Sequence, residues 1–486
     1  MRSIDDGQKK PHMNAGRTRQ RILTFGLTAL AIVVLLVSAV GGFALCLHHK
    51  FSPDPPSNKF PQPASTLEVQ RQDIEQFSRL LDMDRSFSPA ARADADRSIA
   101  ELKSEPTPLD RERFHVALLR ITALADNGHT NLYHGRGSSQ NFTPVRVVLF
   151  ADGLYVLRAK LAYADLLGAR VERIEGRSTA EVIDALELLH GGNEGWRRSY
   201  AAIYVQSPEI LYGDAIGSSP DKTNWTFRLA DGSHVARTLP AEISGANEPP
   251  KMTRWLSPQR MQGEDLNWRA LKSNDADLPV SLRDFNNAFR RAWIDHGCTL
   301  FIQLKAIADV EGHPLGAFLR ATTDEMRAHP PCNIILDMRF NAGGDYTKAA
   351  RFASRLPEFL PRSGRIYLLT GPQTFSAAIT TIAFVKQAAG SRAIILGEPI
   401  GDRLTFYGEG NSGCLPHEDL CLHYATGMHD YAHRCDDWGK CFWLNWIFPV
   451  QVRSLAPDET IEMTFADYNA RRDPVLDRAI ARATIH

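Results

Sequence analysis

A serine stands where an expected strand runs into an expected helix. The segment Thr374-Phe375-Ser376-Ala377-Ala378 follows the short apolar run Ile366–Thr370. Backbone N–H groups in the first turn of a helix have no partner within the helix and favour negative charge. Ser376 is therefore a candidate nucleophile, with the Ala377 N–H beside a developing oxyanion. Serine is also a favoured N-cap, so this position alone fits an ordinary helix start equally well.

A second candidate segment is a turn rich in small residues. The apolar run Asn333–Phe340 predicts a buried strand, and Asn341-Ala342-Gly343-Gly344-Asp345 follows it. Glycine permits positive φ and lets the backbone come close to a ligand. Exposed N–H groups of Gly343 and Gly344 can bind a developing oxyanion. An ordinary strand-to-helix turn is the alternative.

The third candidate is a histidine that follows a glycine. Asn127-Gly128-His129-Thr130 ends an amphipathic stripe that includes Phe114 and Leu118. Imidazole can accept a proton near neutral pH, so His129 is a candidate general base. The alternative is an ordinary exposed surface histidine.

Alternating strands and helices must position these residues. From Thr299 the apolar patterns switch repeatedly between short runs and helical spacing, which predicts a layered α/β core. The expected strands are Leu300–Ala306, Asn333–Phe340, Ile366–Thr370 and Ala393–Gly397, and the expected helices are Pro314–His329, Lys348–Leu360 and Ser376–Ala389.

The chain upstream of this core divides into a helical and a β-rich part. Apolar residues at helical spacing lie between Leu67 and about Tyr133. From about Thr143 the pattern predicts a hairpin around Gly153, a strand leading into a helix, and two more strands. These segments are Val145–Phe150 with Leu154–Leu157, then Leu166–Arg177 with Thr179–Leu189, then Trp225–Thr238. Residues 240–280 give weak signals and are expected to be irregular.

The N-terminus carries a long charge-free segment. Residues 22–47 hold no charged side chain, and as a helix they exceed the ~30 Å core of a bilayer. Several basic residues precede the segment, which predicts a cytoplasmic tail over 1–21 and an exported body. Residues 48–66 contain five prolines and are expected to form an extended spacer. A cleaved signal peptide and a lipid anchor at Cys46 are alternatives.

Composition narrows the function classes. The length of 486 residues suggests about two to four domains, and 43% hydrophobic with 23% charged residues suits a globular body. Net charge is zero, so nothing favours nucleic acid as a partner.

Residues 411–445 are rich in cysteine and histidine. Zinc is one possibility, but the spacings of Cys414 to Cys421 and Cys435 to Cys441 are wider than those of zinc motifs. In an exported region we expect local disulfides instead, and we assign no metal and no cofactor. The nearby tryptophans either line a binding surface or pack internally; they are Trp438, Trp443 and Trp446.

Together these segments resemble the serine peptidase family of tail-specific proteases, C-terminal-processing proteases and the tricorn core. The resemblance covers roughly residues 110–480. Its motifs are Asn127–Thr130, Leu167–Gly176, Asp337–Gly344, Thr374–Ala378, Gly397-Glu398-Pro399, Ala456-Pro457-Asp458 and Arg472-Asp473-Pro474.

The resemblance implies a fold and a division into domains. The expected class is α/β, with a crotonase-like layered catalytic core and a PDZ-like β-rich domain behind one transmembrane helix. The implied domains are a helical region over 67–140, a PDZ-like domain over 141–245, an irregular linker over 246–294, and the core over 295–486 with its insertion at 411–445.

The resemblance also implies roles for site residues. Ser376 is the nucleophile, His129 its base, and the N–H groups of Ala377, Gly343 and Gly344 hold the oxyanion. One branch of the family uses a lysine where this chain has Arg403, and arginine stays protonated. Lys386 lies several helical turns from Ser376, which favours the histidine branch. The orienting acid is left open among Glu398, Asp402 and Glu409.

The expected function is that of a membrane-anchored serine endopeptidase acting on exported or membrane-associated polypeptides. The expected location is a single-pass membrane position with the body on the exported side. The alternatives are a catalytically inactive peptidase-like module that binds peptides or apolar ligands, and a structural envelope protein. Oligomeric state and cleavage preference are left open.

Overall fold

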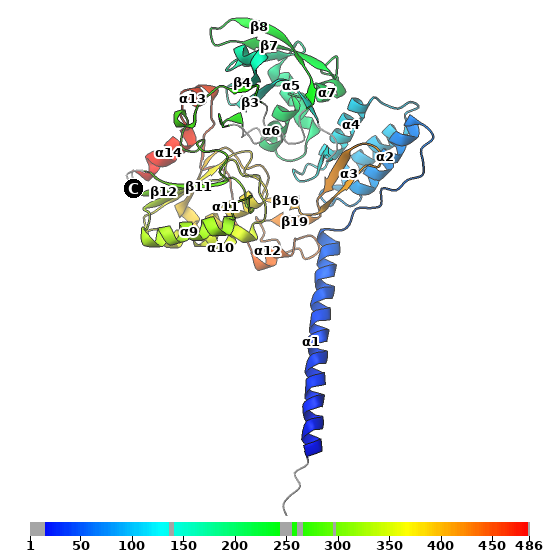
Figure 1. Cartoon of the computed structure of the whole chain (residues 1–486), viewed down its shortest axis with the longest axis vertical. Coiled ribbons are helices and arrows are strands. Elements are labelled where there is room, and N and C mark those ends of the chain that lie inside the picture. The colour runs from blue at the N-terminus through cyan, green and yellow to red at the C-terminus, as the bar shows by residue number, and fades with distance from the viewer. Residues whose placement is uncertain (1–14, 136–139, 244–254, 260–265, 295–297, 485–486) are drawn as a thin grey trace, which may run out of the picture. The chain divides into compact units, whose positions relative to one another are not determined.

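The computed structural model describes residues 15–135, 140–243, 255–259, 266–294 and 298–484. Contacts divide the chain into two compact units, Met1–Pro53 and Asp54–His486 (Figure 1). The first unit is built on one helix, α1 (Ala15–Phe51). Within the described residues, Ile32–Phe51 is long and apolar enough to cross a membrane, with a mean hydropathy of 2.1. The first 14 residues of the predicted tail lie outside the described residues.

The second unit begins with three helices, α2 (Thr66–Leu81), α3 (Pro89–Ser104) and α4 (Arg111–Ala123). Each starts at a capping side chain that accepts a backbone N–H of the first turn; these caps are Ser65, Ser88 and Asp110. The apolar spacing predicts helices in this region, but it does not separate α3 from its neighbours.

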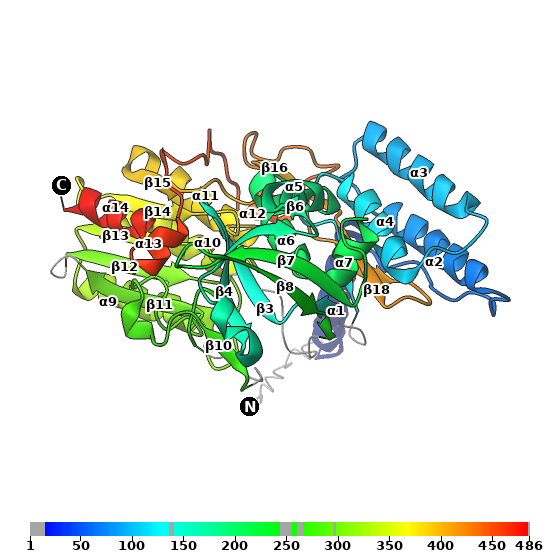
Figure 2. The ribbon, with the colours of Figure 1, turned by 90° about the horizontal axis from the view of Figure 1, so that it is seen from above.

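A seven-stranded antiparallel sheet follows, with helices packed beside it (Figure 2). The order is β10-β4-β5-β7-β8, with β3 paired to β4 and β6 to β5. The hairpin around Gly153 and the later strand pair are confirmed. The strands are β3 (Val145–Phe150), β4 (Gly153–Lys160), β5 (Arg170–Ile174), β6 (Arg177–Ser178), β7 (Lys222–Arg228), β8 (His234–Pro240) and β10 (Trp268–Ala270), and the helices are α5 (Thr179–Leu186), α6 (Glu194–Tyr204) and α7 (Pro208–Gly213).

The core holds a six-stranded sheet in the order β11-β12-β13-β14-β15-β20, parallel except for β11. Every expected core strand is confirmed. The strands are β11 (Phe289–Ile294), β12 (Thr299–Leu304), β13 (Asn333–Asp337), β14 (Ile366–Thr370), β15 (Ala393–Gly397) and β20 (Glu459–Thr460).

Helices cover both faces of this sheet. Side chains alternate along each strand: Leu300 and Ile334 face one cluster, whereas Phe301 and Ile335 face another. The first cluster includes residues of α9 (Leu315–Ala328), α10 (Thr347–Arg355) and α11 (Ala377–Ala389). The second is closed by α14 (Pro474–Ala483).

The expectation of an irregular linker over 246–294 is wrong in its later part. That segment contributes β10 to the seven-stranded sheet and β11 to the core sheet. β10 has only three residues, which is too short for a periodic pattern. β11 is an edge strand of half-buried residues that includes Arg290 and Arg291, so its apolar signal is weak.

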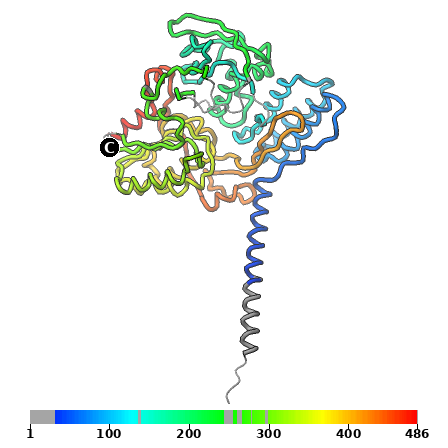
Figure 3. The backbone as a smooth tube through the Cα atoms, in the orientation of Figure 1, coloured from blue at the N-terminus to red at the C-terminus, as the bar shows by residue number. Residues whose placement is uncertain are grey.

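The insertion joins the core to the N-terminal helices. β1 (Asn131–His134), β18 (Leu420–Tyr424) and β17 (Asn411–Cys414) form one sheet, and β16 (Thr405–Gly408) pairs with β19 (Gly427–Asp430). Figure 3 shows this orange segment beside the blue helices of the N-terminal region. The remaining elements are β2 (Asn141–Phe142), β9 (Glu242–Ile243), α12 (Leu444–Ile447) and α13 (Phe465–Asn469).

Both expected local disulfides, Cys414–Cys421 and Cys435–Cys441, are present. A third, Cys298–Cys332, joins the segments that lead into β12 and β13. These bonds and the apolar N-terminal helix indicate the secretory pathway.

Candidate active site

Ser376 has an unusual backbone conformation, with φ 54° and ψ −124°, directly before α11. Such angles are unfavourable for a residue with a Cβ and persist only where the surroundings enforce them. Here the preceding turn is fixed by Thr374, whose N–H donates to the Gly371 carbonyl at 2.8 Å and whose hydroxyl donates to the Met338 carbonyl at 2.9 Å. The Ser376 side chain does not cap the helix, so its hydroxyl has no N-cap role.

The glycine turn lies directly against this serine. Gly343 and Gly344 have φ values of 110° and 136°. A Cβ on Gly343 would lie 2.6 Å from the Ser376 Cβ and 3.0 Å from the Ala377 nitrogen. A Cβ on Gly344 would lie 2.3 Å from the Ile307 carbonyl oxygen, so neither position has room for a side chain.

The three predicted oxyanion donors are not equivalent. The Gly343 N–H already donates to Asn341 Oδ1 at 2.9 Å. The Ala377 N–H belongs to the first residue of α11, where no intrahelical acceptor exists. No hydrogen bond of the Gly344 N–H is found within the described part of the chain. Among the described residues, the N–H groups of Ala377 and Gly344 are therefore the predicted donors that have no acceptor.

His129 lies between two phenylalanine rings rather than on an open surface. Its ring centroid is 4.3 Å from that of Phe375 and 5.5 Å from that of Phe406. The Trp196 ring stacks on the Phe375 ring, and their centroids are 3.9 Å apart. The structure therefore brings the histidine segment against the residue that precedes Ser376. Among the described residues, no hydrogen bond joins His129 to Ser376.

Burial dominates the electrostatics of His129. It lowers the pKa of the imidazole to about 3, with smaller effects of His429 and His423 in the same direction. His129 Nδ1 is buried and has no hydrogen-bond partner among the described residues. The ring is therefore neutral at neutral pH and can accept a proton, but its charged form has no support in this arrangement.

The three candidate acids occupy different surroundings. Burial raises the pKa of Glu398 to about 7, and this residue lines a cavity of about 660 Å³ with Arg339 and Gln373. Burial also raises the pKa of Asp402 to about 7, and its Oδ2 has no partner within the described residues.

Glu409 contacts one histidine and directly follows a residue beside another. Its Oε1 lies 3.4 Å from His429 Nε2. It directly follows Gly408, where an added Cβ would lie 3.6 Å from His129 Nε2.

Arg403, at the position of the family's lysine, holds the histidine segment in place. Its guanidinium donates to both carboxylate oxygens of Asp126, at 3.0 and 2.8 Å, and to the Asp126 carbonyl at 3.0 Å. Lys386 is engaged elsewhere, donating to the Ala393 carbonyl at 2.7 Å.

Sequence reasoning missed a buried carboxylate that fixes the other side of the histidine segment. Asp84 Oδ2 accepts the Thr130 hydroxyl at 2.7 Å and the Ala425 N–H at 2.7 Å. Asn127 Nδ2 donates to the same Thr130 oxygen at 3.0 Å. No local motif indicates this role, because Asp84 lies in the turn between α2 and α3, far from its partners in sequence.

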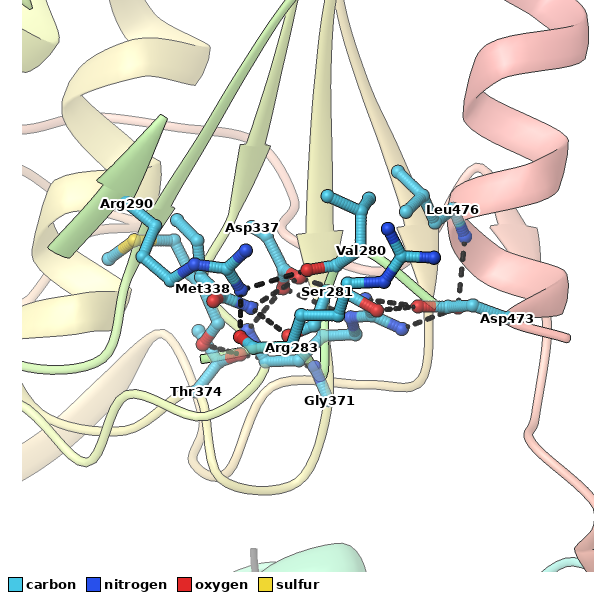
Figure 4. A network of polar contacts seen from close by, with 12 residues as sticks. Val280, Ser281, Arg283, Arg290, Asp337, Met338, Gly371, Thr374, Asp473 and Leu476 are labelled. Carbon is cyan, nitrogen blue, oxygen red and sulfur yellow. Dashed lines mark hydrogen bonds and ion pairs between the residues drawn. The ribbon is translucent and has the colours of Figure 1, made fainter. Parts of the chain in front are cut away.

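A second polar network supports the glycine turn (Figure 4). The Arg339 guanidinium donates to the Asp337 carboxylate at 2.8 and 3.0 Å and to the Asp473 carboxylate at 2.8 Å. Asp473 also accepts the Ser281 hydroxyl. The two family-like motifs around Asp337 and Asp473 thus meet in one buried ion-pair cluster beneath the site.

No metal site emerges from the insertion. All four of its cysteines are in disulfides. In the part of the chain that the structure describes, no three His, Cys, Asp or Glu side chains are arranged to hold a metal ion.

Solved structures of proteases share the mixed α/β fold of this chain, including its N-terminal helical region. The chain matches mature CPAF complexed with lactacystin at 13% identity, covering 86% of this chain and 99% of that chain with a TM-score of 0.53. A CPAF mutant gives 12% identity, 85% and 96% coverage, and a TM-score of 0.55. The Photosystem II D1 C-terminal processing protease matches at 11% identity, 81% and 93% coverage, and a TM-score of 0.36.

The chain therefore has a structural match to S41-family proteases over most of its length. No family model matches the sequence, and no curated protein matches it. At this level of identity, the likeness establishes the fold.

Proposed function

We propose that the protein is a membrane-anchored serine endopeptidase that hydrolyses exported or membrane-associated polypeptides. The observation that carries the proposal is the strained backbone of Ser376 at the start of α11, with Gly343 packed against its Cβ. Strain of this kind is maintained where it serves a function. It leaves the Ser376 hydroxyl free of any capping role, directly before the first N–H group of α11.

The proposed reaction is acyl transfer to water. The Ser376 hydroxyl attacks a peptide carbonyl carbon while His129 accepts its proton. His129 then gives this proton to the leaving amine, and water attacks the acyl group to release the second product. The N–H groups of Ala377 and Gly344 stabilise the oxyanion, and losing one such donor typically costs about 10²–10³ in turnover.

Glu409 is the proposed orienting acid. The charged form of His129 lacks support in this structure, so catalysis requires a carboxylate within its reach. Glu409 already contacts His429 and follows the residue that faces His129 Nε2. Catalytic hydrogen bonds are often longer in the free enzyme and shorten when substrate binds.

The remaining architecture suits a substrate that arrives as an extended chain. We assign residues 141–245 to a PDZ-like domain and 295–486 to a crotonase-like core. The cavity of about 660 Å³ lies between the end of β3 with the following Ala151, the start of α6 and the turn Gly371–Gln373 that precedes Ser376. A chain end added along β3 would therefore be delivered toward the serine.

Residues 22–47 are proposed to remain as a transmembrane anchor, with residues 1–21 in the cytoplasm. This topology would restrict the enzyme to polypeptides on the exported side. No cofactor is required by the proposed chemistry.

The test is hydrolysis of a denatured polypeptide by the Ser376→Ala variant. We expect activity to fall by at least about 10³, because the attacking hydroxyl is removed. Ser391→Ala, at an exposed serine beyond α11, is the matched control and should retain full activity. Unchanged hydrolysis by Ser376→Ala would end the nucleophile assignment.

A second candidate is an inactive peptidase-like module that binds peptides or apolar ligands. The observation that favours it is the absence of a hydrogen bond between His129 and Ser376 in the described structure, together with the buried, unpartnered His129 Nδ1. A fluorophosphonate probe separates the two: covalent labelling of Ser376 supports the enzyme, and a chain that stays unlabelled supports the binding module.

A further inference from the structure

Exposed Trp438 of the insertion packs against half-buried Trp446, and exposed Ile447 directly follows Trp446 in the chain. The Trp438 side chain is 68% exposed, and its ring centroid lies 4.0 Å from that of Trp446. Ile447, the last residue of α12, is 59% exposed. We call Trp438, Trp446 and Ile447 the Trp438 patch. Exposed large apolar side chains that gather at one place on a surface can mark a contact site.

The patch is firmly attached to the fold. The disulfide Cys435–Cys441 closes the loop that carries Trp438. β19 holds the same loop, since the Met428 N–H donates to the Lys440 carbonyl at 2.9 Å and the Met428 carbonyl accepts the Phe442 N–H at 2.9 Å. Asn445 is buried and donates to that carbonyl as well, at 3.2 Å. The patch therefore keeps its place on the surface.

A short series of contacts and chain connections links the start of the second unit, at Pro55, to the loop that carries the patch. Pro55 packs on β17, since a Cβ on Gly413 would lie 2.9 Å from the Pro55 Cβ. Gly413 pairs with Leu422 of β18, and β18 leads directly into β19. Leu422 and Met428 are six positions apart, which is at most about 21 Å of chain.

The link to the candidate membrane span is short. The apolar segment Ile32–Phe51 is separated from Asp54 only by Ser52 and Pro53. A joint of this length reaches about 11 Å at most. If residues 22–47 cross a bilayer, Asp54 lies seven positions beyond the end of the span, which is at most about 25 Å of chain.

The chemistry of the patch fits the membrane–water interface. Tryptophan is enriched there, because its ring is apolar and its N–H is polar. Exposed charged side chains of both signs surround the patch: Asp436 and Asp437 are acidic, and Arg434 and Lys440 are basic. This mixture gives no general attraction to anionic lipid, so binding has to come from apolar insertion.

We propose that the Trp438 patch inserts into the bilayer interface on the exported side and forms a second attachment of the body to the membrane. The first attachment is the proposed anchor, on which this inference rests, and the peptidase chemistry is not involved. Two attachments fix how the body is oriented above the bilayer.

Tryptophan fluorescence offers a direct test, because all eight tryptophans lie at or after Trp196 and none is in the anchor. The full chain is reconstituted in phosphatidylcholine vesicles with bromine atoms on the acyl chains near the headgroups. We expect bromine to quench part of the fluorescence, and Trp438→Phe/Trp446→Phe to remove most of the quenched part. Trp293→Phe, in half-buried β11, is the matched control and should leave the quenched part intact.

A second variant tests the contact itself. Trp438→Lys/Ile447→Lys should reduce the quenching of Trp446 at least about twofold, because charged side chains are costly at the interface. Leu188→Lys, at a comparably exposed residue of the β-rich part, should have no effect. Fluorescence of the inserted wild-type chain that does not respond to bromine would overturn the proposal. This readout needs no hydrolysis, so it is independent of whether Ser376 is a nucleophile.

Discussion

At the scale of single residues, the site depends on how closely two backbone segments approach. Gly343 and Ser376 both have positive φ, and they touch where a side chain on Gly343 would not fit. The Asn341 side chain stabilises this contact, because it accepts the Gly343 N–H and donates to the Leu304 carbonyl at 2.9 Å. The position of the hydroxyl therefore depends on residues that need not touch a substrate.

Substituting Gly343 by alanine tests this dependence. The new Cβ would displace Ser376, and we expect hydrolysis and fluorophosphonate labelling to fall by about 10² or more. Gly390→Ala is the matched control, because Gly390 also has positive φ but faces open space. Both variants carry the backbone strain of about 1–3 kcal/mol, and only the first disturbs the serine. Equal activity of the two variants would contradict this role.

The sequence revealed the residues of the site better than their surroundings. Ser376, Gly343 and His129 lie in short segments whose residue types suggest chemistry. The sequence around Asp84 does not indicate its role, since its partners Thr130 and Ala425 are brought to it only by the fold. The surroundings of His129 were also missed, because the rings that bury it come from Phe375 and Phe406, far along the chain.

At the scale of elements, the turn between β17 and β18 docks on α2 through a buried carboxyl group. Asp73 is fully buried, and its Oδ1 accepts the His417 N–H at 3.0 Å. Its Oδ2 has no partner within the described structure, and burial raises the pKa of the group to about 7, aided by nearby Glu418. The folded state therefore favours the neutral acid.

This docking predicts a pH dependence. Because the folded pKa of Asp73 lies above its unfolded value, stability from this group falls as pH rises from about 4 to about 7. A shift of about three units corresponds to at most about 4 kcal/mol. Thermal unfolding measured at several pH values in this range should show that the stability of Asp73→Asn falls less steeply with rising pH than that of the wild type. Asp96→Asn, exposed on α3, is the control, and identical slopes for all three proteins would contradict the assignment.

The strands of the core sheet were the most predictable elements. β12 to β15 are continuous apolar runs because helices cover both of their faces, and such runs are distinctive. β11 and β10 were missed for the opposite reason. Each lies at the margin of its sheet and carries arginine among its apolar residues.

At the scale of the whole molecule, the proposed topology predicts a sidedness that can be measured. Protease added on the exported side of sealed membranes should digest the body and leave an N-terminal tag protected. The protein should also resist alkaline extraction, whereas arginine at Leu35 and Leu36, each costing about 2.5–3.5 kcal/mol in a span, should release it. A soluble body with a new N-terminus beyond residue 47 would identify a cleaved signal instead.

The pairing of β1 with β18 has a consequence for the order of events during synthesis. β1 begins two residues after His129, and its partner strand is made nearly 300 residues later, after Ser376 itself. A chain still emerging from the translocation machinery therefore lacks the strand that completes the surroundings of its histidine. On the proposed peptidase function, a product cut short before β18 is therefore expected to be inert.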